Sequence, residues 1–227
     1  AIVLHGVYFI QMGSQVDRKN YGDLHRLNKE GSTYFGDQEF YRIDYLSPHS
    51  NLSLYLNRPG IKSFTSLISP RVLPLYESLG NPRTGVTTSQ KPAQAAYRIL
   101  TSVRYYLGEV GEEVAIQGFT PKGKVGRFTR YENSNYLQLG LFYSQYMTRE
   151  EFEALPQKDR DVALVKALVL SPEQISRYGT SVIPIPKESL QDNSYDSLMT
   201  EVTYKKEKES QNLSYEGNTL TLDMKSD

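Results

Sequence analysis

Cysteine is absent from this chain of 227 residues, and so is tryptophan. The lack of cysteine excludes disulfide bonds, thiolate metal sites and a cysteine nucleophile together. It is compatible both with a reducing compartment and with a secreted protein that folds without disulfides. No apolar run approaches the roughly 18 residues that a membrane-spanning helix needs, so the sequence by itself predicts no membrane span.

Histidine is also scarce, with His5, His25 and His49 as the three examples. They form no HxxxH or HExxH motif, so we expect no metal site. Neither a Gly-x-Ser-x-Gly nucleophile elbow nor a Walker-type phosphate loop is present. The adjacent carboxylates of Glu150 and Glu151 fit a helix N-terminus, where negative charge is stabilising. We therefore expect no catalytic residue and no cofactor, with an enzyme built from dispersed residues as an alternative.

The formal charges cancel, yet the two parts of the chain are oppositely charged. Residues 1–131 contain 16 Lys and Arg against 10 Asp and Glu, and residues 132–227 contain 10 against 16. Such asymmetry indicates an anionic partner for one end. We interpret 1–131 as a basic, tyrosine-rich, strand-dominated part and 132–227 as an acidic α+β part, with one continuous domain as the alternative.

Hydrophobic periodicity predicts an α+β fold, strand-rich, with a mainly antiparallel sheet and three or four short-to-medium helices. Strands are predicted at 2–12, 38–46, 51–57, 112–119, 125–131, 135–143, 181–185, 200–206 and 211–224. Helices are predicted at 92–107, from Thr148 to before Pro156, at 158–170 and from Ser171 to near Gly179, with a short helix or loop at 17–31. Residues 58–92, which contain five prolines, are predicted to be an irregular connection with short strands.

Three local patterns support these assignments. Leucines alternate with polar residues over 51–57, as on a strand with one buried face. Apolar residues over 96–107 recur at helical spacing and form one stripe. Thr148 followed by Glu151 has the pattern of a capping box at a helix start.

The strongest candidate for a binding site is the segment 118–131, which interleaves cations, glycines and aromatic rings. Cations beside rings suit an extended nucleic-acid strand, and they also suit an acidic protein surface or a plain solvated hairpin. The candidate contact residues in this segment are Lys122, Lys124, Arg127, Phe128, Arg130 and Tyr131. A second basic cluster contains Arg18, Lys19 and Arg26, and it would extend this surface if the two lie side by side.

These features favour a non-catalytic assembly or binding subunit of a larger complex, which contacts an anionic protein surface or nucleic acid through its basic N-terminal part. The opposite charges of the two parts also permit self-association. The alternatives are a single-stranded RNA- or DNA-binding protein that uses residues 118–131, and an enzyme with a dispersed site.

Overall fold

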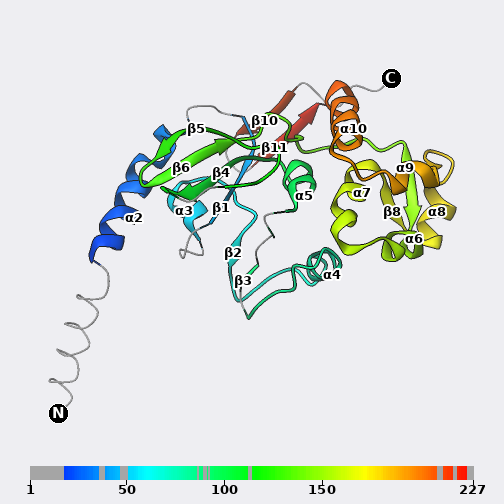
Figure 1. The fold of residues 1–227 in the computed structure, drawn as a ribbon, viewed down its shortest axis with the longest axis horizontal. Helices are drawn as coiled ribbons and strands as arrows, with labels where there is room; N and C mark the ends of the chain where they lie inside the picture. Colours follow the sequence, from blue (N-terminus) through cyan, green and yellow to red (C-terminus); the bar gives the residue numbers. More distant parts are fainter. Residues whose placement is uncertain are drawn as a thin grey trace, which may run out of the picture.

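The computed structural model confirms the α+β class (Figure 1). It describes residues 18–35, 39–46, 51–85, 87, 88, 91, 93–111, 114–208, 212–216 and 219–223. Within these residues there are nine α-helices, more and shorter than the three or four expected, together with four small sheets. The strand predicted at 2–12 lies outside the described residues.

The elements follow one another with short connections. The helices are α2 (Arg18–Glu30), α3 (Leu52–Tyr55), α4 (Leu73–Ser78), α5 (Ala95–Leu100), α6 (Arg149–Ala154), α7 (Arg160–Lys166), α8 (Pro172–Tyr178), α9 (Lys187–Gln191) and α10 (Tyr195–Lys208). The strands are β1 (Arg42–Tyr45), β2 (Ser63–Phe64), β3 (Thr87–Thr88), β4 (Val103–Glu109), β5 (Thr120–Val125), β6 (Phe128–Glu132), β7 (Gln145–Thr148), β8 (Leu168–Leu170), β9 (Ile183–Pro184), β10 (Asn212–Glu216) and β11 (Thr219–Asp223).

The largest sheet has the strand order β1-β4-β6-β5. β1 pairs parallel with β4, whereas β6 pairs antiparallel with both β4 and β5. Successive side chains of a strand point to opposite faces of its sheet. Tyr105 and Leu107 of β4 accordingly pack in one apolar cluster with Leu27 of α2, while Tyr106 packs in a second cluster with Leu79. Both faces of β4 are therefore covered.

The helix predicted over 92–107 is correct only in its first half. α5 ends at Leu100, and the chain turns through Ser102, whose φ of 62° is left-handed, before β4 begins at Val103. β4 contributes apolar side chains to both faces of the sheet, so its sequence shows no two-residue alternation. Periodicity alone cannot separate such a strand from a buried helix.

The strand predicted at 51–57 is wrong, because this segment forms α3. Leu52 and Leu56 are fully buried, whereas Leu54 is 71% exposed. Burial of residues four apart is the helical pattern, and the alternation of three leucines concealed it.

The helix starts predicted in the acidic part are confirmed. The Thr148 hydroxyl accepts a hydrogen bond from the Glu151 backbone N–H at 3.1 Å, and the Glu151 carboxylate accepts one from the Thr148 N–H at 2.8 Å. Ser171 and Gln174 form the same capping box at the start of α8, which ends before Gly179. The predicted strand at 181–185 is present as β9, in a parallel three-stranded sheet of order β8-β7-β9.

Several other predictions need correction. The described residues of 112–119 and 135–143 are not in strands, and 158–170 contains both α7 and β8. The segment 200–206 belongs to α10, because Leu198, Val202 and Lys205 lie at helical spacing and are all buried. The C-terminal hairpin is confirmed by the antiparallel pairing of β10 with β11.

A third apolar cluster joins the two oppositely charged parts of the chain. It contains Ala96 and Ile99 of α5, together with Leu137, Val165 of α7 and Leu198 of α10. Residues from both parts of the chain, 1–131 and 132–227, therefore share this core. The division into two domains stays a prediction.

Candidate functional site

The predicted basic segment 118–131 forms the β5–β6 hairpin. Lys122 and Lys124 are exposed on β5, but Phe128 is fully buried in the first apolar cluster. Arg127 pairs with Glu109 at 3.3 Å. The aromatic side chain expected to stack on a ligand is thus part of the core.

Two further predicted contact residues of this hairpin serve the fold. Arg130 donates a hydrogen bond to the backbone oxygen of Tyr34 at 2.7 Å. Tyr131 is half-buried against the second apolar cluster. The alternating cations and rings of the sequence are therefore distributed between solvent and core.

The C-terminal half of α2, which carries Arg26 of the second basic cluster, lies beside the turn between β5 and β6. Gly126 in that turn has a φ of 55°, and a Cβ there would lie 2.9 Å from Cδ2 of Leu27 in α2. Arg26 is exposed on the same helix. Arg18 and Lys19 belong to the first turn of α2, and their side chains lie outside the described part. The structure thus makes neighbours of two segments that the sequence could not place together.

A different surface is more unusual, because it exposes large apolar side chains. Ten large apolar residues of the described chain are exposed, and five of them fall between residues 46 and 67. They are Leu46, Leu54, Tyr55, Phe64 and Leu67. Phe64 is 51% exposed and Leu67 is 88% exposed. These five residues are grouped in the sequence, at the end of β1, on α3 and in the loop that begins at β2. A group of exposed apolar residues, unlike scattered single ones, indicates an interaction site.

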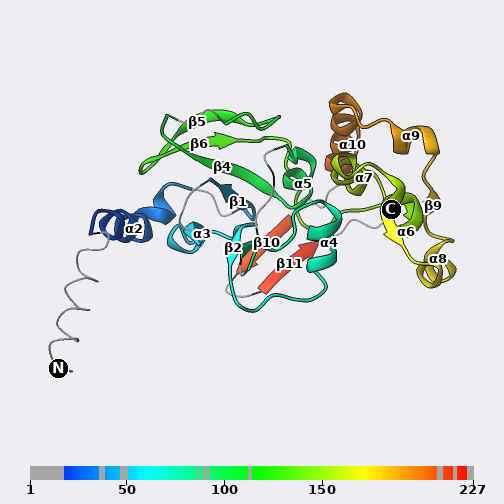
Figure 2. The ribbon, with the colours of Figure 1, turned by 60° about the horizontal axis from the view of Figure 1, so that its bottom comes forward.

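Hydrogen bonds anchor the backbone at Phe64, Thr65 and Leu67. The side-chain amide of Asn51 donates a hydrogen bond to the backbone oxygen of Phe64 at 3.0 Å. Its Oδ1 accepts one from the Phe64 backbone N–H at 2.8 Å. Thr65 donates to the backbone oxygen of Leu67 at 2.9 Å, and the Arg83 guanidinium donates to the backbone oxygen of Thr65. This loop, between β2 and α4, lies at the edge of the fold, away from the central sheet (Figure 1 and Figure 2). Its apolar side chains are therefore presented by an anchored backbone.

The charged residues within this stretch of the sequence are all positive. Residues 45–76 contain no aspartate or glutamate, while they contain Arg58, Lys62 and Arg71. Arg71 is exposed at the end of the loop, and the Lys62 ammonium lies 5.4 Å from the ring centroid of Tyr45. We name residues 46 and 51–71 the apolar–basic surface.

A cavity of about 450 Å³ adjoins this surface, between the approach to β1 and the end of α3. Its walls combine apolar and polar side chains, which are Glu39, Phe40, Tyr41, Ser53, Leu54, Asn57, Arg58 and Pro59. After the end of α3, the chain turns through a left-handed residue, Asn57, with a φ of 51°, and the Arg58 N–H donates to the backbone oxygen of Ser53 at 3.1 Å. Asparagine tolerates this conformation, which is common after a helix end. The turn places Asn57 and Arg58 together at the cavity.

Behind the cavity, arginines and tyrosines alternate through the first apolar cluster. The guanidinium of Arg58 lies 4.9 Å from the Tyr41 ring centroid, and that of Arg104 lies 5.4 Å from Tyr41 and 5.0 Å from Tyr105. The guanidinium of Arg130 lies 4.9 Å from the ring centroid of Tyr105, the same ring that Arg104 contacts. These cation–π contacts explain part of the tyrosine content, and they fix Arg58 at one end of a rigid series.

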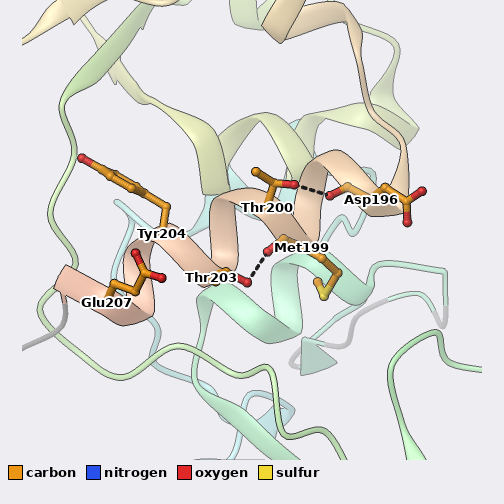
Figure 3. A pocket seen from close by; sticks show the side chains of 6 residues that line it. All are labelled: Asp196, Met199, Thr200, Thr203, Tyr204 and Glu207. Atoms are coloured by element: carbon orange, nitrogen blue, oxygen red, sulfur yellow. Dashed lines mark hydrogen bonds between the residues drawn. The ribbon is translucent and has the colours of Figure 1, made fainter.

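Another hollow runs along α10 and is shallow (Figure 3). Its hydroxyl groups are turned back to their own helix, because Thr200 donates to the Asp196 carbonyl and Thr203 to the Met199 carbonyl, each at 2.9 Å. Tyr204 completes the lining together with Glu207. The hollow therefore offers few directed polar groups to a ligand.

A polar cavity in the acidic part contains a buried lysine, Lys166. Its ammonium donates to the backbone oxygens of Ser189, at 2.8 Å, and of Asp192. Burial lowers the pKa of Lys166, while the charges of Asp192 and Glu201 oppose that shift. Lys166 thereby connects α7 to the end of α9, which is a structural role.

Sequence reasoning missed the apolar–basic surface. The available signal was the run 45–76, which is free of acidic residues and rich in leucine. Among the described residues, no group of three His, Asp or Glu side chains is arranged to hold a metal ion. No helix in the same part of the chain combines the length and apolar character needed to cross a bilayer.

Comparison with known proteins finds a match to a family model. No curated protein and no solved structure matches the chain. The family model described as "Bacterial membrane protein YfhO" matches residues 2–225. This finding contradicts the interpretation of the chain as an assembly subunit or a nucleic-acid-binding protein. The partners expected with that interpretation, which were an anionic protein surface, RNA or DNA, or another copy of the chain, are contradicted with it. The match also contradicts the expectation of a protein without a membrane span. Because the match covers nearly every residue, the chain belongs to the YfhO family of bacterial membrane proteins.

Proposed function

We propose that the described part of this chain is a domain that folds outside the lipid bilayer and docks on the bilayer through the apolar–basic surface. The observation that carries the proposal is the grouping of five of the ten exposed large apolar residues within residues 46–67. A bilayer interface accepts apolar side chains and attracts the cations beside them.

The composition and the core support a location outside the hydrocarbon. Charged residues make up 23% of the chain, and the mean hydropathy is −0.52. The apolar side chains gather in four internal clusters, while β5 exposes five of its six residues. Membrane-embedded helices show the reverse pattern, with apolar residues directed outward.

We further propose that this domain is not itself an enzyme. The support comes from what its buried cations contact. Arg98 pairs with Asp44 at 2.8 Å, and Lys205 donates to the backbone oxygen of Phe142 at 2.9 Å and lies 3.8 Å from the Tyr143 ring centroid. These groups connect elements of the fold.

Vesicle sedimentation tests the docking proposal. The chain is mixed with vesicles of phosphatidylglycerol and phosphatidylcholine, and the bound fraction is measured for the wild type and for Phe64→Ser with Leu67→Ser. Burial of one such side chain is worth about 1.5–3 kcal/mol, and an interface buries only part of it. We expect the double variant to bind at least about tenfold more weakly.

The matched control is Phe142→Ser with Ile183→Ser, which removes similar apolar area from exposed positions outside this surface. It should bind vesicles like the wild type. Equal binding of both double variants and the wild type would contradict the proposed surface.

A further inference from the structure

We infer that the cavity beside the apolar–basic surface binds a small zwitterion that carries a phosphate and a primary ammonium group, as in the headgroup of phosphatidylethanolamine. The inference deepens the proposed function and rests on it for the source of the ligand. Its basis is that one cavity of about 450 Å³ contains both a carboxylate, Glu39, and a guanidinium, Arg58.

The guanidinium suits the phosphate. Arg58 is fixed by its contact with the Tyr41 ring at 4.9 Å, with the Phe35 ring at 5.8 Å, and by donation to the Phe35 backbone oxygen at 2.5 Å. A planar guanidinium held in one orientation is the preferred protein group for a phosphate. The amide of Asn57 and the hydroxyl of Ser53 line the same cavity and supply further polar contacts.

The carboxylate suits the ammonium group. One oxygen of Glu39 accepts a hydrogen bond from Arg104 at 3.1 Å, and the other accepts one from Gln138 at 2.8 Å. A carboxylate has about four acceptor positions, and the side chain of Glu39 is 39% exposed. It is thus positioned by two partners and retains acceptor capacity toward the cavity.

The position and size of the cavity favour a lipid headgroup as the source. Leu54 belongs both to the cavity wall and to the apolar–basic surface, and Phe40 and Pro59 supply further apolar wall. A volume in the lower part of the range for ligand sites suits a headgroup, and the apolar rim suits the chain that follows it.

Isothermal titration calorimetry with soluble phosphoethanolamine tests the cavity without any bilayer. We expect saturable binding that is at least tenfold tighter than that of ethanolamine or inorganic phosphate. Arg58→Gln and Glu39→Gln should each weaken it about 10- to 150-fold, the range for one charge-assisted hydrogen bond. The matched controls Arg177→Gln and Glu77→Gln change exposed charges outside the cavity and should bind like the wild type.

Asn57→Gly provides a variant with little risk to folding, since glycine tolerates the left-handed φ of this position. It should weaken phosphoethanolamine binding about two- to tenfold, as expected for one neutral hydrogen bond. Absence of saturable binding at millimolar phosphoethanolamine, or equal binding of the Arg58 variant, would overturn the inference.

A vesicle arm separates the source of the ligand and the two proposals. Replacing phosphatidylcholine by phosphatidylethanolamine should tighten wild-type binding but not that of Arg58→Gln, while Phe64→Ser with Leu67→Ser should weaken binding to both vesicles. Soluble binding without this lipid preference would assign the site to a free phosphoethanolamine-type compound. Loss of soluble binding with normal docking would overturn the cavity alone. If phosphoethanolamine binds normally in solution, but Phe64→Ser with Leu67→Ser leaves vesicle binding unchanged, the docking proposal alone would be overturned.

Discussion

Replacement of Arg98 by methionine should remove a large share of the stability of this fold. Arg98 is 1% exposed, and its Nε lies 2.8 Å from Oδ2 of Asp44, which is 3% exposed. Its Nη1 also donates to the backbone oxygens of Lys91, at 2.9 Å, and Gln94, at 3.0 Å. The pair therefore connects β1, α5 and the segment before α5. Methionine fills part of the volume but leaves the carboxylate buried without its cation.

The expected loss is about 3–5 kcal/mol, the range for breaking a buried ion pair by removing one partner. The two abandoned carbonyl oxygens place the value toward the upper end of that range. A whole domain is stable by only about 5–15 kcal/mol. The measurement is urea unfolding followed by circular dichroism, because the chain contains no tryptophan.

Two control variants separate the effect of the buried charge from the effect of losing an ion pair. Arg149→Met breaks an exposed pair with Glu153, whose atoms lie 3.9 Å apart, and should cost less than about 1 kcal/mol. Arg98→Met combined with Asp44→Asn should cost less than Arg98→Met alone, because the uncompensated charge is gone. A loss below about 1 kcal/mol for Arg98→Met would mean that the buried charge does not dominate the stability at this site.

Three further predictions concern stability. Ser102→Gly should stabilise the fold by about 1 kcal/mol in urea unfolding, since Ser102 has a left-handed φ of 62° and a buried hydroxyl without a hydrogen-bond partner in the described structure. Leu52→Ala should cost about 2–5 kcal/mol, whereas Leu54→Ala, two residues later and exposed, should cost less than about 0.5 kcal/mol; equal losses would contradict α3. Burial raises the pKa of Asp161, although hydrogen bonds from the backbone, including the Tyr97 N–H, oppose the shift. The stabilising contribution of Asp161 is fully present below the unfolded pKa and is lost as pH rises through the folded pKa. The free energy of unfolding should therefore fall between a pH below 3.8, the ordinary pKa of an aspartate, and about pH 7, and Asp161→Asn should lack that part of the fall.

Local signals in the sequence were sufficient where one element has one buried face or a distinct cap. Thr148 and Ser171 start helices because their hydroxyls bond to backbone N–H groups within the next turn, and such a pattern needs no tertiary information. The C-terminal hairpin was predictable for the same reason, since its two strands are adjacent in the chain.

Other elements depend on partners far away in the chain. β4 is a strand because β1 and β6, which are distant from it in the chain, pair with it on either side. The apolar spacing of 96–107 fits a helix equally well until that pairing is known. α3 shows the converse, because the exposure of Leu54 became visible only when the surrounding fold covered Leu52 and Leu56.

The candidate site was missed for a physical reason. Sequence patterns identify cations beside rings, but they do not show which rings are buried. In the segment 118–131 the ring of Phe128 is in the core, whereas Phe64 and Leu67 are exposed in a loop with few charges. An exposed apolar side chain has no sequence signature of its own, so the apolar–basic surface required the fold.

The absence of cysteine allows one direct measurement of the docking claim. Leu67→Cys, labelled with an environment-sensitive fluorophore, reports on the most exposed apolar position of the surface, and Ser181→Cys reports on an exposed position in the acidic part. With phosphatidylglycerol vesicles, we expect a blue-shifted, brighter emission at position 67 and no change at position 181. An unchanged spectrum at position 67, with the chain bound to the vesicles, would contradict docking through this surface.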